Sequence, residues 1–249
     1  MENQILIAFL LSILAGLSTT IGSAIAFFIR KFKPIYLYLG MGFSAGVMIF
    51  ISFMELLSLS IAKIGLSYAL IAFFSGIFVI YLIDIIVPHT YEKEKGNHNS
   101  NLKRLGLFVA LGIAIHNFPE GFAVFFSSLV EIKLGLLIAV AIALHNIPEG
   151  IAVALPIYYA TKSKAKAFYF SFLSGIAEPI GAFLGYFILF PFITQFILYL
   201  ILSAVAGIMI FISFDELLPF ALKSRRRHTV ILGVLFGMLV AALSLFLIR

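Results

Sequence analysis

Eight long apolar segments constrain the fold of this chain more than any other feature. They are residues 4–29, 35–59, 65–87, 105–129, 134–159, 167–189, 193–220 and 229–248. Each is continuous and close to the length of about 20 residues that a helix needs to cross a bilayer, which favours helices over a β-barrel. Because 63% of the residues are apolar and 11% are charged, a soluble core could not bury this apolar surface. We therefore predict an all-α polytopic membrane protein with eight transmembrane helices, in which residues 1–249 form a single transmembrane domain.

The basic residues predict how the chain is oriented. Fourteen of the 17 lysines and arginines lie in the odd-numbered connections between spans, and three lie in the even-numbered connections or at the termini. The positive-inside rule places the odd connections in the cytoplasm and both termini outside it. We read the first segment as a retained span rather than a cleaved signal peptide, because it is long and has no basic leader. The net charge of +6 thus fits an inner plasma membrane protein that contacts lipids and no nucleic acid.

Two segments far apart in the sequence are nearly identical. Residues 45–57 read AGVMIFISFMELL and residues 206–218 read AGIMIFISFDELL, with eleven of thirteen positions the same. They lie in the second and seventh spans, which run in opposite directions in the predicted topology. A weaker similarity links AGLSTTIG at 15–22 with SGIAEPIG at 174–181, although chance could also produce it. We predict a 3+2+3 inverted repeat, an arrangement that many secondary transporters use to bind substrate near the membrane midplane.

The two central spans carry polar motifs in their middle. HNFPEG occupies 116–121 and HNIPEG occupies 145–150. Residues three or four apart share a helix face, so the polar side chains of each motif project together, and the proline bends the helix and frees a carbonyl. A further carboxylate lies near the middle of the sixth span. We predict that these side chains share one depth: His116, Asn117, Glu120, His145, Asn146, Glu149 and Glu178.

Three carboxylates in mid-membrane need compensation. The predicted spans contain no lysine or arginine, and each buried charge costs roughly 2.5–3.5 kcal/mol on insertion scales. The acids must therefore be protonated or bind a cation. Imidazole with carboxylate suits divalent transition metals such as zinc, iron and manganese, whereas sodium and calcium prefer oxygen alone. The site could hold one ion, or two with Glu120 and Glu149 as bridges; the alternative is that these side chains only join helices by hydrogen bonds.

Four other acids lie near the predicted ends of spans. Glu55 is near the outer end of the second span and Asp84 near the inner end of the third. Asp215 and Glu216 are near the inner end of the seventh. They could gather cations at the entrance and pass them on at the exit. The alternative is that they are ordinary carboxylates at the level of the lipid headgroups.

With HNFPEG, HNIPEG and SGIAEP, the sequence resembles the ZIP (Zrt/Irt-like) family of divalent metal transporters, most of all its broad-specificity bacterial zinc-uptake branch. The resemblance covers nearly the whole chain. It implies that the seven central residues form a binuclear metal centre halfway across the membrane. It also implies uptake of zinc, or of iron, manganese, cobalt or cadmium, into the cytoplasm. The implied mechanism is alternating access, with an elevator-like movement of the first, fourth, fifth and sixth spans against the other four.

Two functions of other kinds fit part of the pattern. An intramembrane metal-dependent hydrolase could use histidine and glutamate to hold zinc and activate water. The sequence has no HExxH motif, however, and both halves carry the same ligand types. A proton- or sodium-coupled carrier of an organic solute is the other alternative. We predict a transporter and not an enzyme, whose metal is cargo rather than a cofactor; the physiological metal, proton coupling and a homodimeric state stay open.

Overall fold

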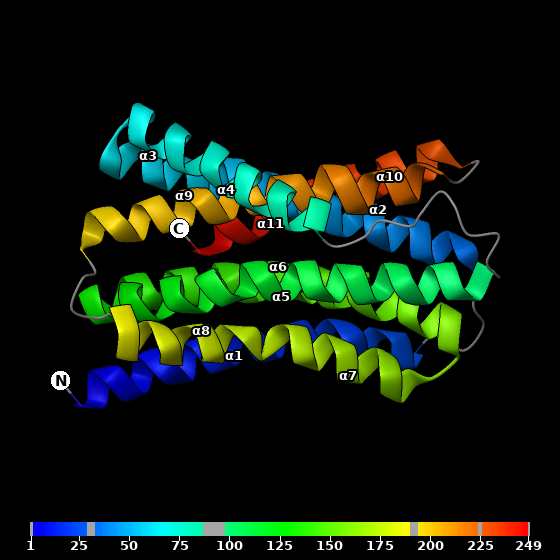
Figure 1. Cartoon of the computed structure of the whole chain (residues 1–249), viewed down its shortest axis with the longest axis horizontal. Helices are drawn as coiled ribbons and strands as arrows, with labels where there is room; N and C mark the ends of the chain where they lie inside the picture. The colour runs from blue at the N-terminus through cyan, green and yellow to red at the C-terminus, as the bar shows by residue number, and fades with distance from the viewer. Residues whose placement is uncertain (1, 29–32, 87–97, 190–193, 224–225, 249) are drawn as a thin grey trace.

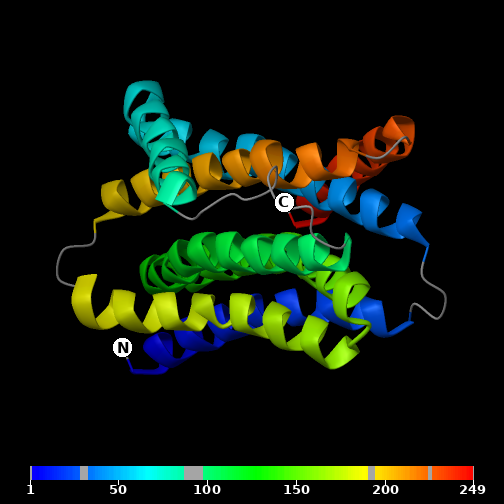
Figure 2. The ribbon, with the colours of Figure 1, turned by 45° about the vertical axis from the view of Figure 1, so that its right-hand side comes forward.

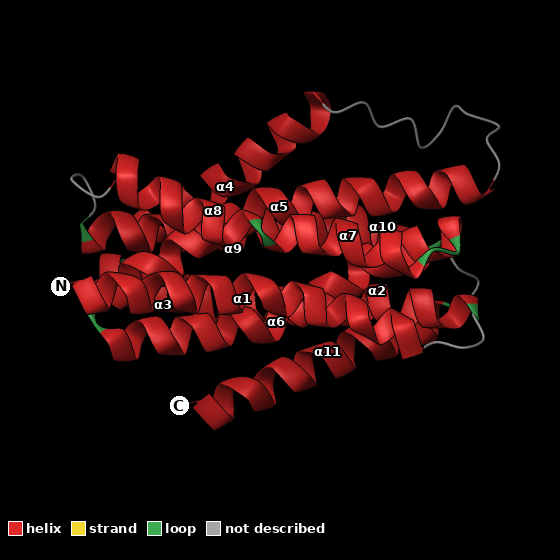
Figure 3. Cartoon of the chain, turned by 90° about the horizontal axis from the view of Figure 1, so that it is seen from below, coloured by secondary structure: helices red, strands yellow, loops and turns green. Residues whose placement is uncertain are grey.

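The structure is a computed structural model that describes residues 2–28, 33–86, 98–189, 194–223 and 226–248. Within these ranges the regular elements are helices and no strand occurs (Figure 3). The α-helices are α1 (Glu2–Phe28), α2 (Pro34–Ile51), α3 (Ser58–Ile64), α4 (Leu66–Ile86), α5 (His98–Val130), α6 (Ile132–Thr161), α7 (Lys164–Gly175), α8 (Ala177–Leu184), α9 (Gln195–Ile212), α10 (Leu218–Leu222) and α11 (Arg227–Ile248). The described π-helical segments are η1 (Ser52–Leu57), η2 (Gly185–Leu189) and η4 (Ser213–Leu217).

Eight helical segments of the described residues are long and apolar enough to cross a membrane, which confirms the predicted number of spans. At two boundaries the helix extends five residues or more beyond the predicted span. The fourth span was predicted from 105, but α5 begins at His98. The first turns of this helix are polar, and the length of an apolar run indicates only the part of a helix that lies in lipid. The second was predicted to end at 59, but the helix continues to Ile64, where Gly65 with φ 83° interrupts it. Predicted ends at 29, 87 and 193 lie outside the described residues.

The helices form two layers (Figures 1 and 2). One layer contains α1, α5, α6 and the α7–α8 pair, which all contact one another. The other contains α2–α3, α4, α9–α10 and α11, with α2 packed on α11 and α4 packed on α9. The layers meet where α2 lies against α6 and α5 lies against α9. Each layer therefore draws helices from both halves of the chain.

Glycines bring the helices of the second layer into close contact. A side chain at Gly46 of α2 would overlap the backbone of Val234 in α11. A side chain at Gly207 of α9 would overlap the carbonyl of Phe73 in α4. Such small residues let helix backbones approach where lipid provides no hydrophobic driving force. The outward faces instead carry large apolar side chains, such as Phe246 at 80% exposure, as expected of a surface in contact with lipid.

The nearly identical segments of α2 and α9 end in the same irregularity. SFMELL forms the π-helical segment η1, and SFDEL forms η4. Each is continuous with the α-helix before it, so the helix slips its register by about one residue without breaking. The two nearly identical sequence segments therefore end in the same uncommon π-helical conformation.

Candidate metal centre

The seven polar side chains predicted for the middle of the membrane are all fully buried in the first layer. Three come from α5, three from α6 and one from the first turn of α8: His116, Asn117, Glu120, His145, Asn146, Glu149 and Glu178. None of them points into lipid. Burying so many polar groups is costly unless each finds a partner, so their partners decide what the site can do.

The histidines pair with the glutamates of the opposite motif. Nε2 of His116 lies 3.0 Å from Oε1 of Glu149, which joins α5 to α6. Nε2 of His145 lies 3.4 Å from both carboxylate oxygens of Glu120, which joins the same helices a second time. The two contacts cross between the helices, and each glutamate thus lies next to ligands from both motifs.

The His116 ring is also fixed from its other side. Its Nδ1 donates to the carbonyl of Gly112, 3.1 Å away and one turn earlier in α5. A metal-binding histidine usually has such a hydrogen bond at the nitrogen that does not bind the metal, because it sets the ring orientation. The contact leaves Nε2 of His116 directed at the carboxylate of Glu149.

Both asparagines are held by their amide nitrogens. Nδ2 of Asn117 donates to the carbonyl of Ser174 in α7, at 3.2 Å. Nδ2 of Asn146 donates to the carbonyl of Ala15 in α1, at 3.0 Å, and to Oε1 of Glu178. With the nitrogens occupied, both side chains present their carbonyl oxygens, which are suitable ligands for a hard or borderline cation.

The buried acceptors have too few donors. Among the described residues, five oxygens and one nitrogen of the seven side chains are buried without a hydrogen-bond partner: Asn117 Oδ1, Glu120 Oε1, His145 Nδ1, Asn146 Oδ1, Glu149 Oε2 and Glu178 Oε2. Leaving a buried acceptor unpaired costs about 1–3 kcal/mol, and more when it is charged. A cation would satisfy several of these acceptors at once, and nitrogen with carboxylate and amide oxygen is a donor set that suits zinc.

Glycines and prolines allow this arrangement. A side chain at Gly121, just after Glu120, would overlap the backbone of Glu178, so only glycine lets α8 approach α5 this closely. Gly150 has the same relation to the backbone of Thr19 in α1. The prolines of both motifs lie inside continuous helices, and the carbonyl of Pro148 accepts a hydrogen bond from Ser44 of α2 at 2.5 Å. From the sequence, Ser44 reads as a packing residue; its hydrogen bond could not be predicted, because it joins helices of two layers.

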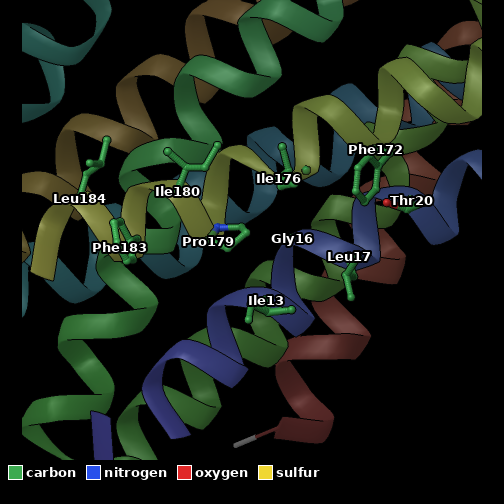
Figure 4. Close-up of a pocket in the computed structure, with 11 residues that line it drawn as sticks. Ile13, Gly16, Leu17, Thr20, Phe172, Ile176, Pro179, Ile180, Phe183 and Leu184 are labelled. Carbon is green, nitrogen blue, oxygen red and sulfur yellow. The ribbon is translucent and has the colours of Figure 1, made fainter. Parts of the chain in front are cut away.

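An apolar groove lies behind the centre, between α1 and α7–α8 (Figure 4). Its volume is about 460 Å³, and it is lined by Gly16, Thr20, Pro179 and large apolar side chains. Pro179 faces this groove, whereas its neighbour Glu178 is fully buried with the other polar groups. The groove is therefore on the outside of the layer and separate from the polar cluster.

Three of the four acids predicted near span ends come together. Asp84 of α4 and Asp215 and Glu216 of η4 each offer an oxygen, and these oxygens lie within 4.8 Å of one another. A small cavity of about 40 Å³ beside them is lined by Asp84 and Glu216 and also by Ile115, the residue before His116. Glu55, in η1, does not belong to this group. Asp84 and Glu216 thus line a small cavity that reaches the residue before His116.

Comparisons with known proteins show the family of this chain. Residues 92–245 match the model of a family described as "ZIP Zinc transporter". The chain is 50% identical to "Zinc transporter ZupT" of Chlorobium luteolum, over 97% of each chain. It is 48% identical to the protein of that name from Campylobacter jejuni, over 99% of this chain and 98% of the other. The identity to that of Streptococcus mutans is 47%, over 99% of both.

Proposed function

Because this chain belongs to the ZIP family of zinc transporters, we propose that it carries zinc across the membrane through the polar centre between α5, α6 and α8. The chain is an integral, multi-pass membrane protein and a transporter rather than an enzyme. The observation that carries the proposal is the set of buried, unpaired acceptors on six of the seven central side chains. A permeation site needs ligand atoms that lack hydrogen-bond partners without the ion, because binding to them compensates the ion for the loss of its hydration shell.

The centre holds two ions. Glu120 and Glu149 each lie between the two motifs and bridge the two positions. The histidines, the asparagine oxygens and Glu178 complete the coordination. The crossed contacts of the ion-free protein support this arrangement. Nε2 of each histidine already lies 3.0 or 3.4 Å from a carboxylate oxygen of the other motif. Iron, manganese, cobalt and cadmium share a preference for such a donor set and are further candidate cargo.

Transport proceeds by alternating access of the first layer against the second. The inverted repeat supports two such states, because exchanging the halves interconverts an outward and an inward opening. Equivalent contacts support the repeat: Gly46 meets Val234, and Gly207 meets Phe73. The same offset of 161 residues relates Gly46 to Gly207 and Phe73 to Val234. The layer that contains the centre is the one expected to move, as in an elevator.

Flux is directed into the cytoplasm, with both chain termini on the opposite side of the membrane. In this orientation Asp84, Asp215 and Glu216 lie on the inner side of the centre and receive the ion as it leaves. Glu55, in the other half of the repeat, lies toward the outer mouth. Bound lipid and a homodimer stay predictions.

Zinc uptake into sealed proteoliposomes tests the proposal, with a zinc-sensitive dye enclosed. The double variant Glu120→Gln/Glu149→Gln keeps the side-chain shapes but removes both bridging charges. Uptake should fall by at least about 100-fold, because the loss of even an outer-shell partner of a metal ligand typically costs about 10–100-fold. Glu131→Gln, at an exposed glutamate between α5 and α6, is the matched control and should transport normally. Unchanged flux in a folded double variant would refute the assignment of the centre.

A further inference from the structure

Thr19 of α1 and Glu178 of α8 occupy equivalent positions in the two halves of the chain. The similar segments AGLSTTIG (15–22) and SGIAEPIG (174–181) align these two residues. In space, a methyl group added to Gly16 would lie 3.2 Å from Cβ of Glu178. A methyl group added to Gly175 would lie 3.1 Å from Cβ of Thr19. The two side chains therefore leave the backbone in matching places, on either side of the contact between Gly16 and Gly175.

The equivalence extends to the polar centre. Asn146 of α6 donates to the carbonyl of Ala15, and Asn117 of α5 donates to the carbonyl of Ser174. Ala15 and Ser174 are the first residues of the two aligned segments. The backbone of Glu178 packs on α5 at Gly121, and the backbone of Thr19 packs on α6 at Gly150. Since the side chain of Glu178 then reaches Asn146 of α6, the matching position of Thr19 faces Asn117 of α5.

The hydroxyl of Thr19 is buried and has no hydrogen-bond partner among the described residues. A threonine in a helix usually donates to the carbonyl four residues earlier. Here that carbonyl, of Ala15, accepts from Asn146 at 3.0 Å and from Ser18 at 2.5 Å instead. Oδ1 of Asn117 is likewise buried and unpaired. The Thr19 hydroxyl on α1 and Asn117 Oδ1 on α5 are thus both unpaired, and the equivalence of the two halves directs the first toward the second.

We propose that Thr19 is a positioning residue of the metal centre, whose hydroxyl holds a water ligand of the ion on the Asn117 side. This rests on the proposed function. The threonine side chain ends two bonds short of the point that the Glu178 carboxylate reaches, and zinc readily keeps water in an open coordination position. Water-mediated contacts of this kind are nearly as favourable as direct ones. The two ion positions then differ: Glu178 contributes a negative charge to one, and Thr19 contributes only a neutral group to the other.

Calorimetric zinc titration of the purified protein in detergent tests the role of Thr19. Thr19→Val removes the hydroxyl at nearly constant shape, and Thr19→Ser retains it. We expect Thr19→Val to weaken one of two binding events by about tenfold, as for groups that support metal ligands, and Thr19→Ser to restore it. Thr20→Val is the control, because Thr20 also has an unpaired hydroxyl but lines the outer groove (Figure 4). It should bind zinc as the wild type does.

The outcomes separate this inference from the function on which it rests. A Thr19→Val titration identical to that of the wild type overturns the role of Thr19, and so does equal weakening by Thr19→Val, Thr19→Ser and Thr20→Val. If the Thr19→Val protein unfolds, Thr19→Ala removes the same hydroxyl with less bulk and is compared with Thr19→Ser. Normal binding of both ions by Glu120→Gln/Glu149→Gln would instead overturn the metal centre itself.

Discussion

Nε2 of His116 lies 3.0 Å from Oε1 of Glu149, and both side chains are fully buried. The two residues belong to different motifs, 33 positions apart, and their contact fixes α5 against α6 in the middle of the protein. In a membrane interior, neither group has water to replace its partner. This contact thus contributes to the stability of the ion-free protein, and in the proposed metal centre its two atoms would become ligands of the ion.

His116→Ala should reduce the stability of the ion-free protein. Removing one member of a buried pair typically costs about 3–5 kcal/mol, because the other is left without compensation. His145→Ala should cost less, since its contact with Glu120 is longer, at 3.4 Å. Thermal unfolding of both variants in detergent without zinc measures the difference. An equal loss of stability in the two would contradict the ranking.

Gly121→Ala should impair zinc uptake by at least about tenfold. The added methyl group overlaps the backbone of Glu178, and overpacking of this kind costs about 1–3 kcal/mol or displaces α8 and its carboxylate. Gly112→Ala, in the same helix, is the control, because its methyl group would make ordinary contacts at 3.6 Å and longer. Uptake assays in proteoliposomes compare the two, and similar rates would show that Gly121 does not set the position of α8.

Gly46→Ala and Gly207→Ala should destabilise the protein to a similar extent. Each methyl group would overlap a helix backbone in the second layer, and the two positions are equivalent in the proposed repeat. We expect a loss of about 1–3 kcal/mol for each, measured by denaturant unfolding. A large effect of one and none of the other would count against equivalent packing in the two halves.

Asp84→Asn/Asp215→Asn/Glu216→Gln should slow uptake several-fold but leave zinc binding at the central site intact. In the proposed function the cluster attracts the ion as it leaves the centre, and its charge is not needed for the proposed coordination by α5 and α6. Parallel uptake and calorimetric measurements separate the two effects. Loss of the central binding events would show that the acids belong to the same site.

The orientation can be tested directly, because the chain contains no cysteine. Lys133→Cys, at the start of α6, should react with a membrane-impermeant maleimide added to intact cells. Lys166→Cys, at the start of α7, should react only after the membrane is opened. Both lysines are exposed in the structure, so access to the reagent depends on the side of the membrane. The reverse pattern would invert the predicted topology.

Local sequence was sufficient for the helices and for the identity of the central side chains. The length of an apolar run is set by the bilayer, and a spacing of three or four residues places side chains on one helix face. Eight spans and the buried polar motifs could therefore be predicted. The start of α5 at His98 could not, because its polar first turns extend beyond the apolar run.

The tertiary structure decided which of these side chains meet. It crosses His116 with Glu149 and His145 with Glu120, and it gathers Asp84 with acids of a distant helix. It also fixes the asparagine nitrogens on carbonyls of α1 and α7, which leaves their oxygens for a cation. Such relations depend on how closely two helix backbones approach and at what angle they pack. Glycines at the contacts permit the approach, but only the packing of all the helices determines which faces come together.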